Sequence, residues 1–285
     1  MKLDPDGRLR TIYSPAGTVT GRLNSTQTPW GTGWNSQNAP PWFRVAIVPD
    51  EGYILGSVDL KQAEAVLVAY FAKEPDMIQC FQDKEDIHRF NASNIYGIPA
   101  DQVSKTQRYT AKRLVHAFDY MLGDDHAASI AETSIAEARR VKKAYFGRFP
   151  RILEWHEEVR NEIQETRTLV NPFGRRRLFL DRLGDELVRK AVAFLPQSTC
   201  VDTTNEALLR FDGAIRRDSA LGDIKLLLQV HDEIVFEFRL EQQEKIMEVL
   251  KECYDIPIEI NGMECRIGIE FKTGENWREM KEVAI

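Results

Sequence analysis

Residues Lys225–Phe238 read KLLLQVHDEIVFEF, an apolar stretch with His231, Asp232 and Glu233 at its centre. Apolar runs on both sides of a short polar segment predict two strands joined by a tight turn. His-Asp-Glu is not a favoured turn sequence, whereas Asn-Gly and Asp-Gly are. A packed sheet gives the rigid support that a metal site needs. Both a plain polar turn and a functional acid therefore remain open for Asp232.

Apolar periodicity outside this hairpin predicts a mixed chain of helices and strands. Residues 53–60 form a short apolar run typical of a buried strand, and residues 265–271 alternate like a strand. Pro196 is expected to kink or break one of the predicted helices. Amphipathic or helix-favouring stretches predict helices at 62–72, 86–96, 104–122, 134–149, 152–166, 185–211 and 240–254.

The composition narrows the class of protein. The chain has 285 residues, of which 43% are hydrophobic and 29% are charged, which excludes disorder, collagen and a disulfide scaffold. A formal net charge of −6 argues weakly against nucleic-acid binding, although net charge does not describe local patches. Four scattered cysteines without a C-x-x-C pair give no zinc signature and favour a reducing compartment. Because no long apolar run is present, we expect a cytoplasmic protein.

A second acid lies at the end of the strand predicted at 53–60. Asp59 stands there, followed five residues later by Glu64. An acid at a strand end and Asp232 on a hairpin turn can face each other across a sheet, and two such carboxylates can bridge two Mg²⁺ ions ~3.5–4 Å apart. Mg²⁺ prefers oxygen ligands, which fits a site without cysteine. The alternative for Asp59 alone is a helix N-cap, because a helix is expected to follow it.

Four residues spaced by four form a stripe along the helix predicted at 104–122. Arg108 and Lys112 supply positive charge, and His116 and Tyr120 supply rings on the same side. This order suits a triphosphate followed by a sugar and a base, because the cations neutralise phosphate and a ring can stack on a base. The alternative is a solvated basic face whose aromatic residues lie in the core.

Together these features resemble family A DNA polymerases, the DNA polymerase I family. Motif A of that family, D-x-S-Q-I-E, corresponds to DLKQAE at 59–64, and motif C, V-H-D-E, is unchanged at 230–233. Motif B, R-x-x-x-K-x-x-x-F-x-x-x-Y-G, matches the register of the stripe at 108–120. The order and spacing of the motifs agree over about residues 9–280. Further matches are TGRLNS at 20–25, NSQNAP at 35–40, DIHR at 86–89 and GENW at 274–277.

The resemblance implies a template-directed DNA polymerase core that adds dNTPs to a primer 3′-hydroxyl and releases pyrophosphate. It implies two Mg²⁺ ions, for which Mn²⁺ can substitute, held by Asp59, Asp232 and the carbonyl of Leu60. Lys112 and Glu233 complete the catalytic set that the family pattern implies. Positioning and electrostatics then account for most of the catalysis.

The partners that the resemblance implies are the dNTP and a primer–template DNA. Glu64 is expected to act as the steric gate against a ribose 2′-hydroxyl, and Tyr120 to close the pocket behind the template base. The full set expected at the dNTP is Gln62, Glu64, His88, Arg108, Lys112, His116 and Tyr120. The set expected at primer and template is Arg22, Gln37, Asn38, Arg189, Gln197 and His231.

The sequence also departs from the family pattern. His116 stands where the family has Phe or Tyr against the sugar, which puts sugar discrimination in question. Met121 replaces the Gly of motif B, Lys61 replaces an aromatic or small residue of motif A, and Ala193 replaces an Asn before Gln197. Pocket shape and fidelity are therefore expected to differ from the family pattern, in a direction that the sequence does not give.

By resemblance the fold class is α+β, with a right-hand palm of antiparallel sheet and helices at 1–65 and 183–285. Mostly helical fingers are expected at 66–182, and the family's thumb and exonuclease domains are expected to be absent. Either the chain is a fragment, or a second chain supplies a thumb or exonuclease domain. The alternative functions are a split-polymerase fragment inactive without that partner, a non-catalytic replication accessory subunit, a two-metal nuclease and an RNA polymerase. Glu64, as the expected steric gate, argues against an RNA polymerase.

Overall fold

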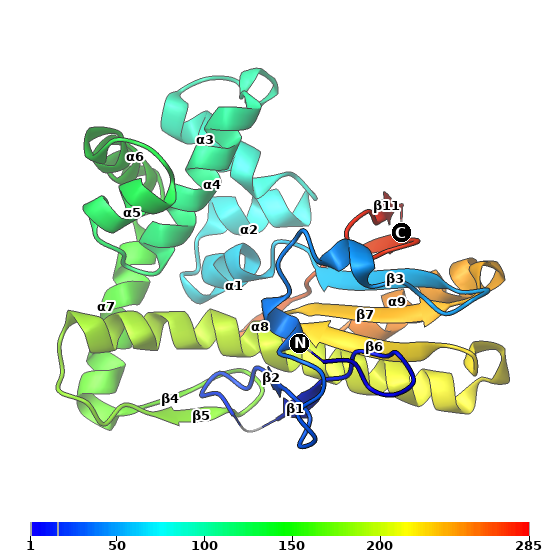
Figure 1. The fold of residues 1–285 in the computed structure, drawn as a ribbon. Helices are drawn as coiled ribbons and strands as arrows, with labels where there is room; N and C mark the ends of the chain where they lie inside the picture. The colour runs from blue at the N-terminus through cyan, green and yellow to red at the C-terminus, as the bar shows by residue number, and fades with distance from the viewer. Residues whose placement is uncertain (1, 16, 285) are drawn as a thin grey trace. The chain divides into compact units, whose positions relative to one another are not determined.

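The stretch at 225–238 forms the predicted hairpin, and this hairpin is part of an antiparallel sheet. The sheet has five strands in the order β11–β10–β3–β7–β6 (Figure 1). The strand predicted at 53–60 is confirmed as β3, which lies at the centre of the sheet. The strands are β3 (Ile54–Leu60), β6 (Lys225–Val230), β7 (Glu233–Phe238), β10 (Ile269–Gly274) and β11 (Lys281–Val283).

The computed structural model describes residues 2–15 and 17–284, and these form two compact units. Unit 1 comprises residues 1–63, 198–257 and 266–285, and it contains the five-stranded sheet. Unit 2 comprises residues 64–197 and 258–265, and it is mainly helical. Each unit therefore combines segments that are far apart in the sequence. None of the helices in the described part of the chain has the length and apolar content that a membrane crossing requires.

One face of the sheet in unit 1 carries a cluster of buried phenylalanines. Phe236 of β7 stacks on Phe271 of β10 with ring centroids 6.2 Å apart, and it contacts Phe211 of helix α8 (Asp185–Arg217) edge-on at 5.2 Å. Helix α9 (Gln243–Tyr254) and the C-terminal part of α8 lie behind this sheet in Figure 1. Aromatic side chains bury large apolar areas, so this cluster contributes strongly to the stability of the unit.

The opposite face of the sheet is covered by the N-terminal segment. Leu55 and Val235 are buried there with Trp277, and Trp34 and Ile47 pack against them. This segment holds strands β1 (Ile12–Ser14) and β2 (Asn24–Thr26) and the 3₁₀ helices η1 (Ser36–Asn38) and η2 (Arg44–Ala46).

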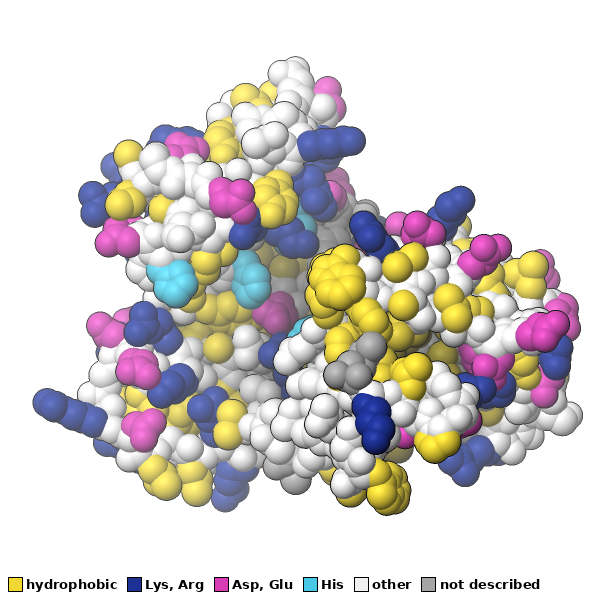
Figure 2. Space-filling model, in the orientation of Figure 1, with side chains coloured by type: hydrophobic (Ala, Val, Ile, Leu, Met, Phe, Trp, Pro, Cys, Tyr) yellow, Lys and Arg dark blue, Asp and Glu magenta, His cyan; other side chains and the backbone are white. Residues whose placement is uncertain are grey.

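The N-terminal segment is attached to the edge strand β6 through Tyr13. The Tyr13 hydroxyl donates to the backbone carbonyl of Gln229 at 3.1 Å and accepts from the backbone N–H of Gln229 at 2.9 Å. Figure 2 shows hydrophobic side chains exposed over this segment, and its most exposed are Trp30 at 81% and Trp42 at 69%. The segment therefore both covers the sheet and presents apolar surface.

Unit 2 is built from helices that follow one another along the chain. Ser104 and Gln107 form a capping box at the start of α4, and Asp86 caps α3. These caps explain why the predicted helices begin where they do. The helices are α1 (Ala63–Phe71), α2 (Pro75–Gln82), α3 (Ile87–Tyr96), α4 (Lys105–Asp119), α5 (Asp124–Ile130), α6 (Ile135–Arg148) and α7 (Arg151–Thr166), with the short η3 (Ala100–Gln102).

Two short hairpins complete unit 2. One pairs β4 (Thr168–Val170) with β5 (Arg176–Leu178), and the other pairs β8 (Ile258–Ile260) with β9 (Met263–Cys265). The side-chain amide of Asn261, in the turn between β8 and β9, donates to the carbonyls of Tyr70 and Phe71, both at 3.1 Å. These are carbonyls at the end of α1, which have no partner inside a helix.

Two expectations from the sequence differ from the structure. The strand expected at 265–271 is the end of β9 and part of β10, because residues 266–268 lie outside both strands. Pro196 does not end its helix, since α8 runs unbroken from Asp185 to Arg217. A proline inside a helix costs ~3 kcal/mol, and the burial of Phe194 and Leu195 beside it offsets that cost.

Candidate functional site

The register of the sheet places Asp59 close to the turn that holds Asp232. Val58 of β3 is paired with Ile234 of β7. One step further along β3 is Asp59, and one step back along β7 is Glu233, directly after the turn. Because the strands are antiparallel, both acids come to the same end of this strand pair. His231 opens the turn with φ +59°, the left-handed conformation that a two-residue hairpin turn requires.

The electrostatics of Asp59 fit a bound cation. Burial, together with the Asp232 and Glu233 carboxylates, raises the pKa of Asp59 to about 7. Its Oδ1 atom is buried and has no hydrogen-bond partner in the structure. Like charges so arranged are unfavourable unless a positive charge lies between them. No group of three His, Cys, Asp or Glu side chains able to hold a metal occurs in residues 2–15 and 17–284. Asp59 and Asp232 therefore fit an ion such as Mg²⁺, which is held by one or two carboxylates and keeps water or substrate oxygens as its other ligands.

The helix N-cap alternative for Asp59 is wrong. Asp59 lies inside β3, where it pairs with Glu270 of β10, and α1 begins only at Ala63. Leu60 is the last residue of β3, and Gln62 follows it with φ +55°. The Gln62 Oε1 atom is buried without a hydrogen-bond partner, which leaves one amide oxygen close to the strand end.

Three further side chains surround these acids in unit 1. The Trp277 indole donates to Glu233 Oε1 at 3.3 Å, and the Arg44 guanidinium lies 4.2 Å from the Trp277 ring centroid. The Cys200 thiol donates to Asp232 Oδ2 at 3.8 Å. Sequence reasoning missed the role of Cys200, because a single cysteine in a helix shows no pattern. It noted Trp277 only as part of GENW and did not foresee this contact.

The predicted stripe lies on α4 and at its C-terminal cap. Lys112 and His116 are exposed, Arg108 is half-buried, and Tyr120 is buried at the cap. The rings of His116 and Tyr120 meet edge-on with centroids 5.0 Å apart. The alternative of a solvated face therefore describes Lys112 and His116, which are exposed. It does not describe Tyr120, whose buried hydroxyl makes a hydrogen bond within unit 2.

That contact is with Glu64, on the first turn of α1. The Tyr120 hydroxyl donates to Glu64 Oε2 at 2.5 Å, and His116 Nε2 lies 3.7 Å from the same oxygen. Three predicted nucleotide-site residues that are as much as 56 positions apart thus converge in unit 2. A carboxylate held in this way has a fixed position, which is what a steric gate requires.

A second group of predicted residues meets at the start of α3. The Arg108 guanidinium is bound to the Asp86 carboxylate, with Nε to Oδ2 at 2.7 Å and Nη2 to Oδ1 at 3.1 Å. His88 is 9% exposed, and its Nδ1 atom has no hydrogen-bond partner in the structure. Burial, with the nearby charges of Lys112 and Arg108, lowers the pKa of His88 to about 4. At neutral pH His88 is therefore a neutral ring beside two cations.

The residues predicted to contact DNA differ in their exposure and in their hydrogen bonds within the protein. The Gln37 amide donates to the Leu23 carbonyl at 2.7 Å and accepts from the Ser25 backbone at 3.2 Å, so it also holds the N-terminal loop together. Asn38, Arg189 and His231 are exposed, whereas Arg22 and Gln197 are half-buried.

The predicted residues divide between the two units. Asp59, Leu60, Gln62, Asp232 and Glu233 belong to unit 1, together with Arg22, Gln37, Asn38 and His231. The remainder belong to unit 2, namely Glu64, His88, Arg108, Lys112, His116, Tyr120, Arg189 and Gln197.

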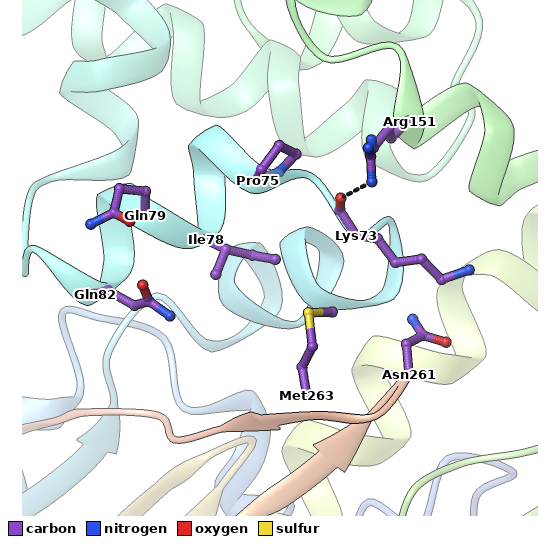
Figure 3. Close-up of a pocket in the computed structure, with 8 residues that line it drawn as sticks. All are labelled: Lys73, Pro75, Ile78, Gln79, Gln82, Arg151, Asn261 and Met263. Atoms are coloured by element: carbon purple, nitrogen blue, oxygen red, sulfur yellow. Dashed lines mark hydrogen bonds between the residues drawn. The ribbon is translucent and has the colours of Figure 1, made fainter.

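Unit 2 also has an open pocket of about 430 Å³ at the end of α1 (Figure 3). Arg151 donates from its guanidinium to the Lys73 carbonyl at 2.9 Å at one side of this pocket. None of its lining residues is a predicted site residue. They are Lys73, Pro75, Ile78, Gln79, Gln82, Arg151, Asn261 and Met263.

Solved structures and curated proteins show what this chain is similar to. The polymerase domain of Pol1 from M. smegmatis, solved in complex with DNA primer–template and dNTP, aligns with a TM-score of 0.85 and 27% identity. The alignment covers 97% of this chain and 49% of that chain. DNA polymerase I of Pseudomonas aeruginosa is 29% identical over 292 residues, which is 96% of this chain and 30% of the relative.

A thermostable relative gives the same result. DNA polymerase I of Thermus aquaticus is 28% identical over 290 residues, covering 97% of this chain and 33% of that protein. The chain therefore spans about a third of the length of these two curated relatives. The model of the family described as "DNA polymerase family A" matches residues 1–279. This match extends over nearly the whole chain and includes both units, so the chain belongs to DNA polymerase family A.

Proposed function

We propose that this chain catalyses template-directed addition of deoxynucleotides to the 3′-hydroxyl of a DNA primer, with release of pyrophosphate. The single observation that carries the proposal is the acid pair of Asp59 and Asp232 at one end of a rigid strand pair. An unpartnered buried oxygen on Asp59 supports it. The domain assignment proposed with it is a palm at 1–65 and 183–285 and fingers at 66–182.

We propose that Asp59 and Asp232 hold two Mg²⁺ ions, with the Leu60 carbonyl as a further ligand and Mn²⁺ as a possible replacement ion. When bound, the ions supply Lewis-acid activation of the primer hydroxyl and neutralise the leaving group. The protein's own part is to hold the two carboxylates in place at one end of the strand pair. Glu233, fixed by the Trp277 indole, supports the turn that carries Asp232.

In the proposed dNTP site, Arg108, Lys112 and His88 bind the triphosphate. Lys112 has no ion-pair partner among the residues that the structure describes, so its charge is available to a phosphate. The neutral His88 ring can give or accept a hydrogen bond at its unpartnered Nδ1 without adding charge. Gln62 and the rings of His116 and Tyr120 complete this set.

Selection for deoxyribose is assigned to Glu64. Its carboxylate is held by the Tyr120 hydroxyl and faces the His116 ring, so it cannot easily move aside for a 2′-hydroxyl. DNA contacts are assigned to Arg22, Gln37, Asn38, Arg189, Gln197 and His231. The similar polymerase domain, which was solved with primer–template and dNTP, supports these two partners.

The test is extension of a labelled primer on a template with Mg²⁺ and dNTPs. Asp232→Ala should abolish extension, because one metal-holding carboxylate is lost, and a chelator should abolish extension by the wild type. Asp255→Ala is the matched control, since Asp255 is an exposed acid of unit 1 whose ion-pair partner is Arg266. It should extend primers like the wild type.

Circular dichroism must show that each variant is folded. Normal extension by a folded Asp232→Ala variant would make the metal assignment wrong. Degradation of DNA without dNTP would favour the nuclease alternative. Binding of dNTP without any extension by the wild type would support a second chain that completes the polymerase.

A further inference from the structure

The ion pair between Asp86 and Arg108 has a definite geometry. Arg108 presents its side edge to Asp86, with Nε 2.7 Å from Oδ2 and Nη2 3.1 Å from Oδ1. Arginine has five N–H donors, so this contact leaves three of them, one on Nη2 and two on Nη1. The Asp86 carboxylate therefore fixes the plane of the guanidinium without using its whole hydrogen-bonding capacity.

Asp86 is itself held by the backbone of α3. Its Oδ1 accepts from the backbone amides of His88 at 3.0 Å and Arg89 at 3.2 Å, as the N-cap of that helix. Although burial works against it, the hydrogen bonds from Arg108 and from the Arg89 backbone hold the pKa of Asp86 below its ordinary value. The carboxylate is thus ionised at neutral pH and anchored to a rigid helix end.

The two cations of the stripe differ in this respect. Lys112, one turn further along α4, has no carboxylate partner among the described residues, whereas Arg108 is tied to α3. A free arginine side chain would lose rotamer entropy of up to ~2 kcal/mol when it grips a ligand. Because Asp86 has already immobilised Arg108, this cost is met by folding and not by ligand binding.

We propose that Asp86 is a positioning residue for the incoming nucleotide, which orients Arg108 so that its free edge binds the triphosphate. This inference rests on the proposed function. The Asp86–Arg108 pair stays intact when the nucleotide binds, because phosphate oxygens use the donors that Asp86 leaves. Asp86 acts through Arg108 and does not touch the nucleotide.

An opposing effect makes the proposal testable in direction. A carboxylate near a triphosphate repels it, so removal of its charge would tighten nucleotide binding if repulsion were the larger effect. If orientation of Arg108 were the larger effect, removal of the Asp86 charge would weaken nucleotide binding, because the guanidinium would no longer be held in place. The KM for dNTP therefore distinguishes the two effects.

The experiment uses Asp86→Asn, which keeps an oxygen to cap α3 but weakens the hold on Arg108. We expect KM for dNTP to rise at least tenfold while kcat stays within threefold, and the equilibrium Kd for a fluorescent dNTP to rise equally. The matched control is Asp124→Asn, another acid at a helix start in unit 2, which is paired with Arg139 at 3.1 Å and Lys142 at 3.0 Å. Its KM should equal that of the wild type.

A double-mutant cycle separates positioning from a general loss of structure. In an Arg108→Ala background, Asp86→Asn should change KM less than twofold, because the group that it orients is gone. An unchanged or lower KM for Asp86→Asn would overturn the proposal, as would an equal effect in both backgrounds. A wild type that neither binds dNTP nor extends primers would instead contradict the proposed function.

Discussion

The Tyr120 hydroxyl donates a 2.5 Å hydrogen bond to the Glu64 carboxylate, across 56 positions of sequence within unit 2. His116 Nε2 is 3.7 Å from the same carboxylate oxygen. The contact joins the end of α4 to the start of α1, two of the elements that carry the proposed nucleotide residues. Sugar selection should therefore depend on both members of the pair and not on Glu64 alone.

Glu64→Ala should lower the ratio of kcat/KM for dATP over ATP at least tenfold, because the obstacle to the 2′-hydroxyl is removed. Tyr120→Phe keeps the ring but removes the hydroxyl that donates to the Glu64 carboxylate, so it should lower the ratio by a smaller factor. Single-nucleotide incorporation at equal enzyme concentration measures both. If both variants discriminate like the wild type while using dATP normally, Glu64 is not the gate.

Lys112→Ala should reduce productive dNTP use by about 10- to 100-fold, because a charge-assisted contact to phosphate is worth ~1.5–3 kcal/mol. Binding of primer–template should change less than threefold. Lys105→Ala is the control, since Lys105 is an exposed lysine at the start of the same helix. Incorporation kinetics measure dNTP use, and a filter-binding assay measures the affinity for primer–template. Equal losses in both would place Lys112 at the DNA.

Asp119 makes the stability of the protein depend on pH. It is 3% exposed and accepts a 2.7 Å hydrogen bond from the Tyr145 hydroxyl, while its carbonyl accepts from His156 Nε2 at 2.9 Å. Burial raises the pKa of Asp119 to about 7, against the hydrogen bond from Tyr145, and the Glu64 charge adds to the rise. Between about pH 4 and pH 7, Asp119 is therefore protonated in the folded state and ionised in the unfolded state.

The free energy of unfolding should therefore fall as the pH rises from about 4 to 7, by up to a few kcal/mol in total. Asp119→Asn, which stays neutral and still accepts from Tyr145, should flatten this part of the profile and be more stable than the wild type at pH 8. Urea unfolding at several pH values measures the effect.

Asp124→Asn provides a control of opposite sign for that measurement. Hydrogen bonds from Lys142 and Arg139 lower the pKa of Asp124, so its ionised form stabilises the folded state above its unfolded pKa and that contribution is lost as the pH falls. The variant should lose stability at pH 8 and little at low pH. A pH profile of Asp119→Asn parallel to that of the wild type would exclude Asp119 as the source.

Gly56→Ala should destabilise unit 1 by ~1–3 kcal/mol, the usual cost of overpacking a core. A Cβ atom at Gly56 of β3 would lie 2.7 Å from the Phe236 ring in the adjacent strand. Gly147→Ala in α6 is the control, because a Cβ there meets nothing within 4 Å, and it should be neutral or stabilising by up to ~1 kcal/mol. Denaturant unfolding compares them, and equal effects of the two changes would contradict the packing argument.

Local patterns in the sequence accounted for the elements that carry the candidate site. The strand–turn–strand period predicts β6 and β7 with Asp232 between them, and the four-residue spacing predicts the stripe from Arg108 on α4. The first prediction succeeds because apolar runs flank a short polar turn, and the second because a helix repeats every 3.6 residues. The same reasoning failed for Pro196, since the local penalty of a proline does not reveal that its neighbours are buried.

By itself the sequence determined the kinds of element, the polar turn and the order of charges and rings along α4, because these follow from apolar patterning and residue spacing within one stretch of chain. Only the tertiary structure decided that Asp86 fixes Arg108 and that Tyr120 holds Glu64. Such contacts join residues distant in sequence. They depend on how the elements pack, which residue spacing along a single element does not encode.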